Sequence, residues 1–335
     1  MLDRPLPDLA ANLALRRQGQ SLRLQLDRAG QELASGRKTD MFAAAGGDPA
    51  RLLAIERGQA ATSAAIDGLA LAESRIAAVQ ASLGRIEDAA GSVGAPLLAA
   101  IRRDDPVATR ALASEARSAF ADVVSRLNTH SGGRALFSGT AVDGDALAPA
   151  ETMLADLAAA AAGAADAADL VSRIDAWFDA PGGPFETTGW LGEGDAPRVR
   201  LGEGGEAAIS VRADAGEFRD VLKALALVAT VADPAYAGPA HAVDELLETG
   251  AERAISAVES VVALRAEIGL SEARIEESQA AAQARRAALD LAWNDAVMRD
   301  PFEAASAFQA LEVQIQTAYT VTTRISRLTL ADMLR

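Results

Sequence analysis

The stretch Leu69–Val93, LALAESRIAAVQASLGRIEDAAGSV, decides the fold of this chain. Its apolar residues recur at alternating steps of three and four positions, which is the heptad spacing of a coiled-coil helix. Such a helix carries a narrow apolar stripe that needs a partner helix. We call this stripe the rod seam, and its larger members are Leu69, Ile76, Val79, Leu83, Ile86 and Val93.

Both ends of the chain carry stripes of the same kind, so the simplest partner for each end is the other end. Isolated helices with one narrow apolar face are marginally stable, so we expect residues 1–36 and 300–335 to be poorly ordered in the monomer. The predicted assembly interface consists of Leu22, Leu26, Leu33, Leu311, Ile315, Ile325 and Leu328.

The composition favours slim, closely packed helices and hence an elongated, mainly α molecule. Alanine supplies much of the 50% apolar fraction and aromatic residues make up only 4%. No cysteine is present, which excludes disulfides, thiolate catalysis and the usual zinc sites. No apolar run reaches the roughly 20 residues that span a bilayer, and the start lacks the pattern of a cleaved signal peptide. We therefore expect a protein without membrane insertion that does not use a cleaved signal.

The negative charge is concentrated in the middle of the chain. The formal net charge is −15, and residues 143–220 hold 16 acidic residues against 5 arginines. An acidic segment stays hydrated and discourages contact with nucleic acid or anionic membranes. Partners are therefore expected at the near-neutral ends, and nucleic acid is not among them.

Four Asp-Pro pairs predict helix starts, because aspartate caps a helix and proline suits its first position. They begin at Asp48, Asp105, Asp233 and Asp300. The first long helix is expected to run from Pro49 toward Pro96, where the next proline stands, and another occupies most of the proline-free stretch from Pro239 to Pro301.

The middle region has different signals. One alanine-rich helix is expected over residues 152–178, a β-hairpin over 197–201 and 208–212, and a helix over 218–231. The predicted domains are therefore the terminal coiled-coil helices 1–36 and 300–335, a helical rod of 37–137 and 240–299, and an inserted acidic α+β outer domain of 138–239.

No pattern in the chain predicts an enzyme. His130 and His241 stand alone at predicted element boundaries, and the glycines of 202–205 lie between strands and do not open a helix. The segment Phe137-Ser138-Gly139 lacks the first glycine of a nucleophile elbow. We predict no catalytic residue, no cofactor site and no metal site.

Several motifs resemble the flagellin family. Leu33-Ala-Ser-Gly-Arg37 ends a helix, and Asp48-Pro49 opens the next one, as in the flagellin N-terminal signature. The segment Ala135-Leu-Phe-Ser-Gly-Thr140 and the ending Ser326-Arg-Leu-Thr-Leu-Ala-Asp-Met-Leu334 are similar to elements of the flagellin-like hook–filament junction protein. The match covers about the first 140 and last 95 residues. Residues 39–43 depart from the usual pattern, and Met333 stands where an aromatic residue is common.

The resemblance implies a structural component of the bacterial flagellum, at the junction between hook and filament. The implied fold is an elongated helical rod whose terminal helices pair as a coiled coil, with a small inserted α+β domain. The implied partners are copies of the chain, flagellin, another hook-associated protein and an export chaperone on the C-terminal helix. The implied location is extracellular, after type III export without a cleaved signal peptide.

Three alternatives stay open at this point. A flagellin, the filament subunit itself, shares the terminal signatures. An intracellular coiled-coil scaffold also uses long alanine-rich heptad helices, but its ends would be stably folded in isolation. An enzyme is the third.

Overall fold

The computed structural model describes residues 6–333 except 45, 47, 203–204 and 237, with side chains described from Leu13 to Arg324 except Met41. The fold is mainly α, which confirms the predicted class. The described chain forms two compact units. Unit 1 comprises residues 1–63 and 283–335, and unit 2 comprises residues 64–282.

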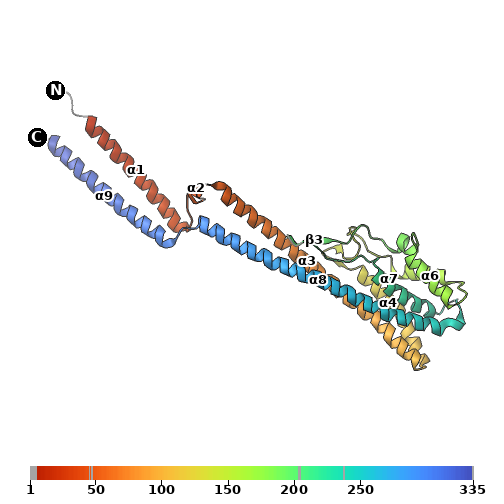
Figure 1. The fold of residues 1–335 in the computed structure, drawn as a ribbon. Helices are drawn as coiled ribbons and strands as arrows, with labels where there is room; N and C mark the ends of the chain where they lie inside the picture. Colours follow the sequence, from red (N-terminus) through yellow and green to blue (C-terminus); the bar gives the residue numbers. More distant parts are fainter. Residues whose placement is uncertain (1–5, 45, 47, 203–204, 237, 334–335) are drawn as a thin grey trace. The chain divides into compact units, whose positions relative to one another are not determined.

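The described part of unit 1 is mainly helical (Figure 1). It contains α1 (Leu6–Ser35), the short α2 (Met41–Ala44), the start of α3 (Pro49–Arg102), the end of α8 (Val243–Val297) and α9 (Pro301–Met333). Helix α1 packs along α9, so the predicted pairing of the terminal helices is confirmed.

Unit 2 holds the rest of α3 and α8 together with the middle of the chain. Its helices are α4 (Pro106–Leu127), α5 (Ala150–Ala161), α6 (Ala167–Asp179) and α7 (Gly216–Ala232), with a π-turn at Phe185–Gly189 and a 3-10 turn at Ala240–Ala242. Two antiparallel pairs complete it, β1 (His130–Ser131) with β2 (Arg134–Ala135) and β3 (Arg198–Arg200) with β4 (Glu206–Ala208).

The rod seam is the buried face of α3 in unit 2. Ile76, Val79, Leu83, Ile86 and Val93 are completely buried, and Leu69 is nearly so. Helix α8 runs beside α3 there, since Gln80 donates a hydrogen bond of 3.0 Å to the carbonyl of Arg265 and Arg265 pairs with Glu87. The apolar stripe predicted from the heptad spacing is therefore the face of α3 that is buried in unit 2.

Helix α3 continues through Pro96, where the sequence predicted its end. Proline removes one backbone hydrogen bond and costs a helix interior about 3 kcal/mol. Beyond it Leu97, Leu98 and Ala100 are buried, and a buried leucine side chain contributes about 1.5–3 kcal/mol. Burial of the extra turn offsets the proline, whose own ring lies at the exposed surface.

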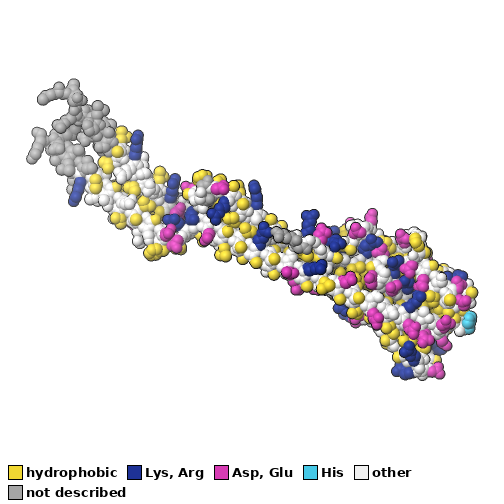
Figure 2. All heavy atoms as spheres, viewed as in Figure 1, with side chains coloured by type: hydrophobic (Ala, Val, Ile, Leu, Met, Phe, Trp, Pro, Cys, Tyr) yellow, Lys and Arg dark blue, Asp and Glu magenta, His cyan; other side chains and the backbone are white. Residues whose placement is uncertain are grey.

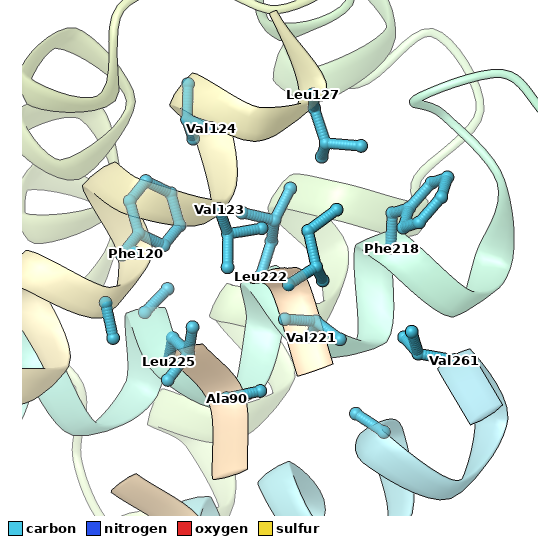
Figure 3. Close-up of a cluster of buried hydrophobic side chains, with 14 of the residues drawn as sticks. Ala90, Phe120, Val123, Val124, Leu127, Phe218, Val221, Leu222, Leu225 and Val261 are labelled. Carbon is cyan, nitrogen blue, oxygen red and sulfur yellow. The ribbon is translucent and has the colours of Figure 1, made fainter. Parts of the chain in front are cut away.

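The core of unit 2 lies between α4 and α7 (Figure 3). Phe120, Val123 and Leu127 of α4 face Phe218 and Leu222 of α7, and all five are completely buried. Helix α7 belongs to the segment 138–239, which we predicted to be an outer domain. The compact unit instead includes this segment together with α4 and the flanking stretches of α3 and α8.

Three local predictions in the middle region were wrong. Asp233-Pro234 does not open a helix, because Asp233 caps the C-terminal end of α7. The expected helix 152–178 is two helices, because Gly163 takes a left-handed conformation (φ +77°) and Asp166 caps α6 by accepting a hydrogen bond from the amide of Asp169. The second hairpin strand is 206–208 and not 208–212, since β4 begins directly after the turn and the chain then leaves the ladder.

The segment Leu136-Phe-Ser-Gly-Thr140 is hydrogen-bonded to two other segments of the middle region. The carbonyl of Phe137 accepts a hydrogen bond from Ala213 (2.9 Å), and the carbonyl of Ser138 accepts one from Glu193 (3.0 Å). Gly139 has φ +70°, and a Cβ there would lie 2.3 Å from the carbonyl oxygen of Glu193. Only glycine fits this position, which explains the motif in physical terms.

Candidate assembly surface

Helices α1 and α9 pack as an antiparallel hairpin within unit 1. Leu22 and Leu26 of α1, and Leu311 and Ile315 of α9, are half-buried along this contact. Of the described side chains of these two helices, Ala29 and Ala304 are the ones that are buried. A two-helix contact covers only one stripe of each helix, so the remaining surface of the hairpin stays open to solvent.

Two contacts fix the register of the hairpin. A Cβ at Gly30 would lie 3.4 Å from the ring of Phe308, so the Phe308 side chain packs against α1 at this glycine. Arg23 donates a hydrogen bond to the hydroxyl of Tyr319, and its guanidinium lies 5.5 Å from the centre of that ring. The hydrogen bond to Tyr319 raises the pKa of Arg23.

The base of the hairpin is held by backbone hydrogen bonds. The amide of Lys38 donates to the carbonyl of Val297 and the amide of Arg299 to that of Gly36, both at 2.9 Å. The ammonium of Lys38 donates to the carbonyl of Ala296 (3.0 Å) at the C-terminal end of α8. Gly36 ends α1 in a left-handed conformation (φ +66°), as the Ser35-Gly36 pair predicted.

Helices α3 and α8 also meet within unit 1, with little apolar burial. Gln59 donates a hydrogen bond of 2.6 Å to Asp290, and Arg286 donates one of 2.7 Å to Ser63. The apolar part is a small cluster of buried and partly buried side chains, Leu52, Trp293, Ala296 and Val297. This contact is therefore largely polar.

Unit 1 exposes more large apolar side chains than it buries. Among its described residues six apolar side chains are buried, three of them alanine, whereas eleven large ones are exposed. Figure 2 shows hydrophobic side chains at its surface. The exposed ones are Leu13, Leu24, Leu33, Phe42, Leu53, Leu291, Met298, Phe302, Val313, Tyr319 and Val321. A surface of this kind marks an interaction site.

The structure places the predicted interface residues in three groups. Leu22, Leu26, Leu311 and Ile315 face the contact between α1 and α9, while Leu33 is 41% exposed. Ile325 and Leu328 lie outside the residues whose side chains are described.

A second set of apolar residues was not predicted from the sequence. Leu13 and Leu24 on α1, and Phe302 and Val313 on α9, are all exposed and belong to no heptad stripe. Each pair is eleven residues apart, which is about three helical turns. This spacing was the signal that a search for heptads alone overlooks.

Two of the cavities formed by described residues lie in unit 2. One of about 580 Å³ lies where α3, α4, α7 and α8 end or begin, above Ile101, Val231 and Leu247. The other, of about 510 Å³, is lined by paired charges, including Arg253, which donates hydrogen bonds of 2.6 and 3.1 Å to Asp175. Those hydrogen bonds raise the pKa of Arg253.

Among the described residues, no group of three or more acidic or histidine side chains is placed to hold a metal ion. His130 and His241 are exposed. No helix within the described ranges is long and apolar enough to cross a membrane.

Comparisons with known proteins agree with the resemblance read from the sequence. Residues 252–334, which include most of α8 and α9, match the family model of the bacterial flagellin C-terminal helical region. No curated protein sequence matches the chain.

Two solved structures share the fold. One is a protein of Vibrio parahaemolyticus assigned as flagellar hook-associated, with a TM-score of 0.54 and 16% identity over 75% of this chain and 99% of that one. The other is FlgL of Bacillus cereus, with a TM-score of 0.51 and 14% identity over 72% of this chain and 100% of that one. These comparisons show a flagellin-type C-terminal helical region and a fold shared with the two structures.

Proposed function

We propose that this chain is a structural component of the bacterial flagellum that joins the hook to the filament. In this proposal the subunits associate through unit 1, whose exposed apolar side chains become buried between neighbours. Subunits associate in this proposal by non-covalent packing, and the shape of the paired helices α1 and α9 sets the direction of assembly.

The observation that carries this proposal is the flagellin-type C-terminal region, which includes the same helix α9 that is left with exposed apolar side chains. The hook-associated assignment of a structural relative favours the junction over other positions in the flagellum. The neighbours that we propose are copies of this chain, flagellin and a second hook-associated protein.

Export and protection before assembly are part of the same proposal. An exposed apolar helix such as α9 is an aggregation hazard in the cell. We therefore propose that an export chaperone holds α9 before export, and that the chain leaves the cell through the flagellar type III apparatus.

The test is the phenotype of cells that lack the gene. We expect hooks without filaments on the cell and filaments in the medium, both visible by electron microscopy. Antibody labelling of the native protein should mark the joint between hook and filament. Normal filament attachment in the deletion strain, or a protein found only in the cytosol, would contradict the proposal. Either result would favour the alternative of an intracellular coiled-coil scaffold.

A second candidate is a flagellin, because the matched family model describes the flagellin C-terminal region. A flagellin would be labelled along the entire filament, and its loss would shorten or remove the filament without releasing it. The same labelling experiment therefore separates the two functions.

A further inference from the structure

The cavity of about 580 Å³ in unit 2 lies where α3 and α7 end and α4 and α8 begin. Its floor is apolar, since Ala113, Val231 and Leu247 line it and are only 3%, 6% and 5% exposed. Ile101 and Val243 also line it and are partly buried. Small-molecule sites usually have volumes of about 300–1,000 Å³ and a mainly apolar lining. The cavity therefore has the size and the base of a ligand pocket.

The mouth of this cavity is acidic. Asp104 and Asp105 line it between α3 and α4, and Asp244 lines it in the first turn of α8. The only basic residue of the lining is Arg110, so three carboxylates and one guanidinium give a formal net charge of −2. Two helices end here and two begin, so the partial charges of the helix termini largely cancel. The side chains therefore set the field at the mouth, and this field favours a cation.

Two of the three carboxylates are available to a ligand. Asp105 is engaged as the N-cap of α4, because it accepts a hydrogen bond of 3.0 Å from the amide of Ala108. The carboxylates of Asp104 and Asp244 are exposed and have no ion pair or hydrogen bond with a described residue. Asp104 also has a φ of +53°, in the left-handed region where glycine is the usual residue at a helix end. A free charge thus stands at the mouth where the turn itself would favour glycine.

We propose that this cavity binds a small organic amine, with its apolar body on the floor and its ammonium at the mouth beside Asp104 and Asp244. The site is a recessed cavity of ligand size, and two free carboxylates suit a single ammonium better than a polybasic surface. All of its lining residues belong to unit 2, apart from the proposed assembly surface of unit 1. This binding activity goes beyond the proposed function and does not depend on it.

Three probes of similar size and shape separate charge from apolar contact, namely 4-phenylbutylamine, 4-phenylbutanol and 4-phenylbutyrate. Ligand-observed NMR titration of the full chain gives a Kd for each probe. The amine should bind about tenfold more tightly than the alcohol, because its ammonium adds charge-assisted hydrogen bonds, and the carboxylate should bind most weakly.

Two substitutions at the mouth test the position of the ammonium. Asp104→Gly removes a carboxylate and suits the left-handed backbone, so it should raise the Kd of the amine about fivefold without lowering the midpoint of thermal unfolding. Asp244→Asn should raise that Kd by a similar factor. The matched control is Asp122→Asn, which removes an exposed carboxylate of α4 about 24 Å along the helix from Pro106 and should leave the Kd unchanged.

The proposal is overturned if the amine does not bind, if amine and carboxylate bind equally well, or if Asp104→Gly leaves the Kd of the amine unchanged. The peptide acetyl-Leu-Arg-Leu-amide carries the same chemistry on a protein segment. Binding of this peptide more than about tenfold tighter than the amine would also overturn the proposal, and would point to a protein partner. Filament attachment tests the proposed function separately, so the two failures are distinguishable.

Discussion

Helices α3 and α8 contribute to both units of this chain, but the two units differ in how many apolar side chains they bury. Among the described residues unit 2 buries 58 apolar side chains and exposes 5 large ones, whereas unit 1 buries 6 and exposes 11. Unit 2 has 17 basic and 34 acidic residues, and unit 1 has 15 and 13. Unit 2 thus has a well-buried apolar core and a strongly acidic composition. Unit 1 is nearly neutral, and most of its large apolar side chains are exposed.

The difference shows how one heptad pattern serves two ends. In unit 2, side chains of α3, α4, α7 and α8 form one apolar cluster, and the side chains of the rod seam are buried in it. In unit 1, α1 has α9 as its neighbour and its seam stays half-buried. The number of neighbouring helices, and not the pattern itself, decides whether a stripe is a core or a candidate interface.

The largest effect should come from a charge placed in the core of unit 2. Leu83→Asp removes a completely buried side chain and buries a carboxylate without a partner, so we expect a loss of about 5 kcal/mol in the free energy of unfolding. Leu71, on the same helix, is 73% exposed, and Leu71→Asp should cost less than about 0.5 kcal/mol. Thermal unfolding measures both, and equal losses would refute the register of the rod seam.

A smaller effect is expected at the glycine that fastens the middle region. Gly139→Ala places a Cβ against the carbonyl of Glu193 at a left-handed residue, so we expect a loss of at least about 2 kcal/mol. Gly132 also has a positive φ but no atom within 4 Å of a Cβ, so Gly132→Ala should cost only about 1 kcal/mol. Urea unfolding should rank the two variants in this order, and the reverse order would contradict the role of this segment.

The ion pair between α6 and α8 should contribute less. Arg253→Gln removes two hydrogen bonds to Asp175, but both side chains are about one third exposed, so solvent screens the pair. We expect a loss of about 1 kcal/mol at low salt and less at 1 M salt. A loss that does not change with salt would show that the arginine acts through packing.

The smallest change should be a gain, and it lies in unit 1. Gly30 is inside α1, and a Cβ there meets the ring of Phe308 at 3.4 Å, an ordinary contact. Gly30→Ala should therefore stabilise α1 by about 0.5–1 kcal/mol through helix propensity. Circular dichroism of the full chain would detect the added helicity, and a decrease would mean that the two helices approach more closely than the structure shows.

The sequence predicted regular features well and irregular ones poorly. The rod seam, the pairing of the ends and the cap at Gly36 follow from spacing and from glycine chemistry, which act locally. The continuation of α3 beyond Pro96 could not be predicted from such local signals, because it is stabilised by the tertiary burial of Leu97 and Leu98. The central place of α7 depends on contacts with α4 about a hundred residues away, which periodicity does not reveal.

The candidate interface was predicted only in part for a related reason. Heptad spacing pointed to Leu22, Leu26, Leu311 and Ile315, which are half-buried on α1 and α9. It did not identify Leu13, Leu24, Phe302 and Val313, which are exposed and lie outside the heptad stripes. Their significance emerges once the pairing of the hairpin shows which face remains open.

Hydrogen exchange of the intact chain, measured by mass spectrometry in the free monomer and in isolated flagella, tests the central claim most directly. We predict rapid exchange of the α1 and α9 amides in the monomer, because one half-buried stripe protects a helix weakly, and strong protection in flagella. The amides of α7 and of α3 from residue 69 to 93 should be protected in both states. Equal protection of α1 and α9 in the two states would contradict the claim that unit 1 is completed by its neighbours.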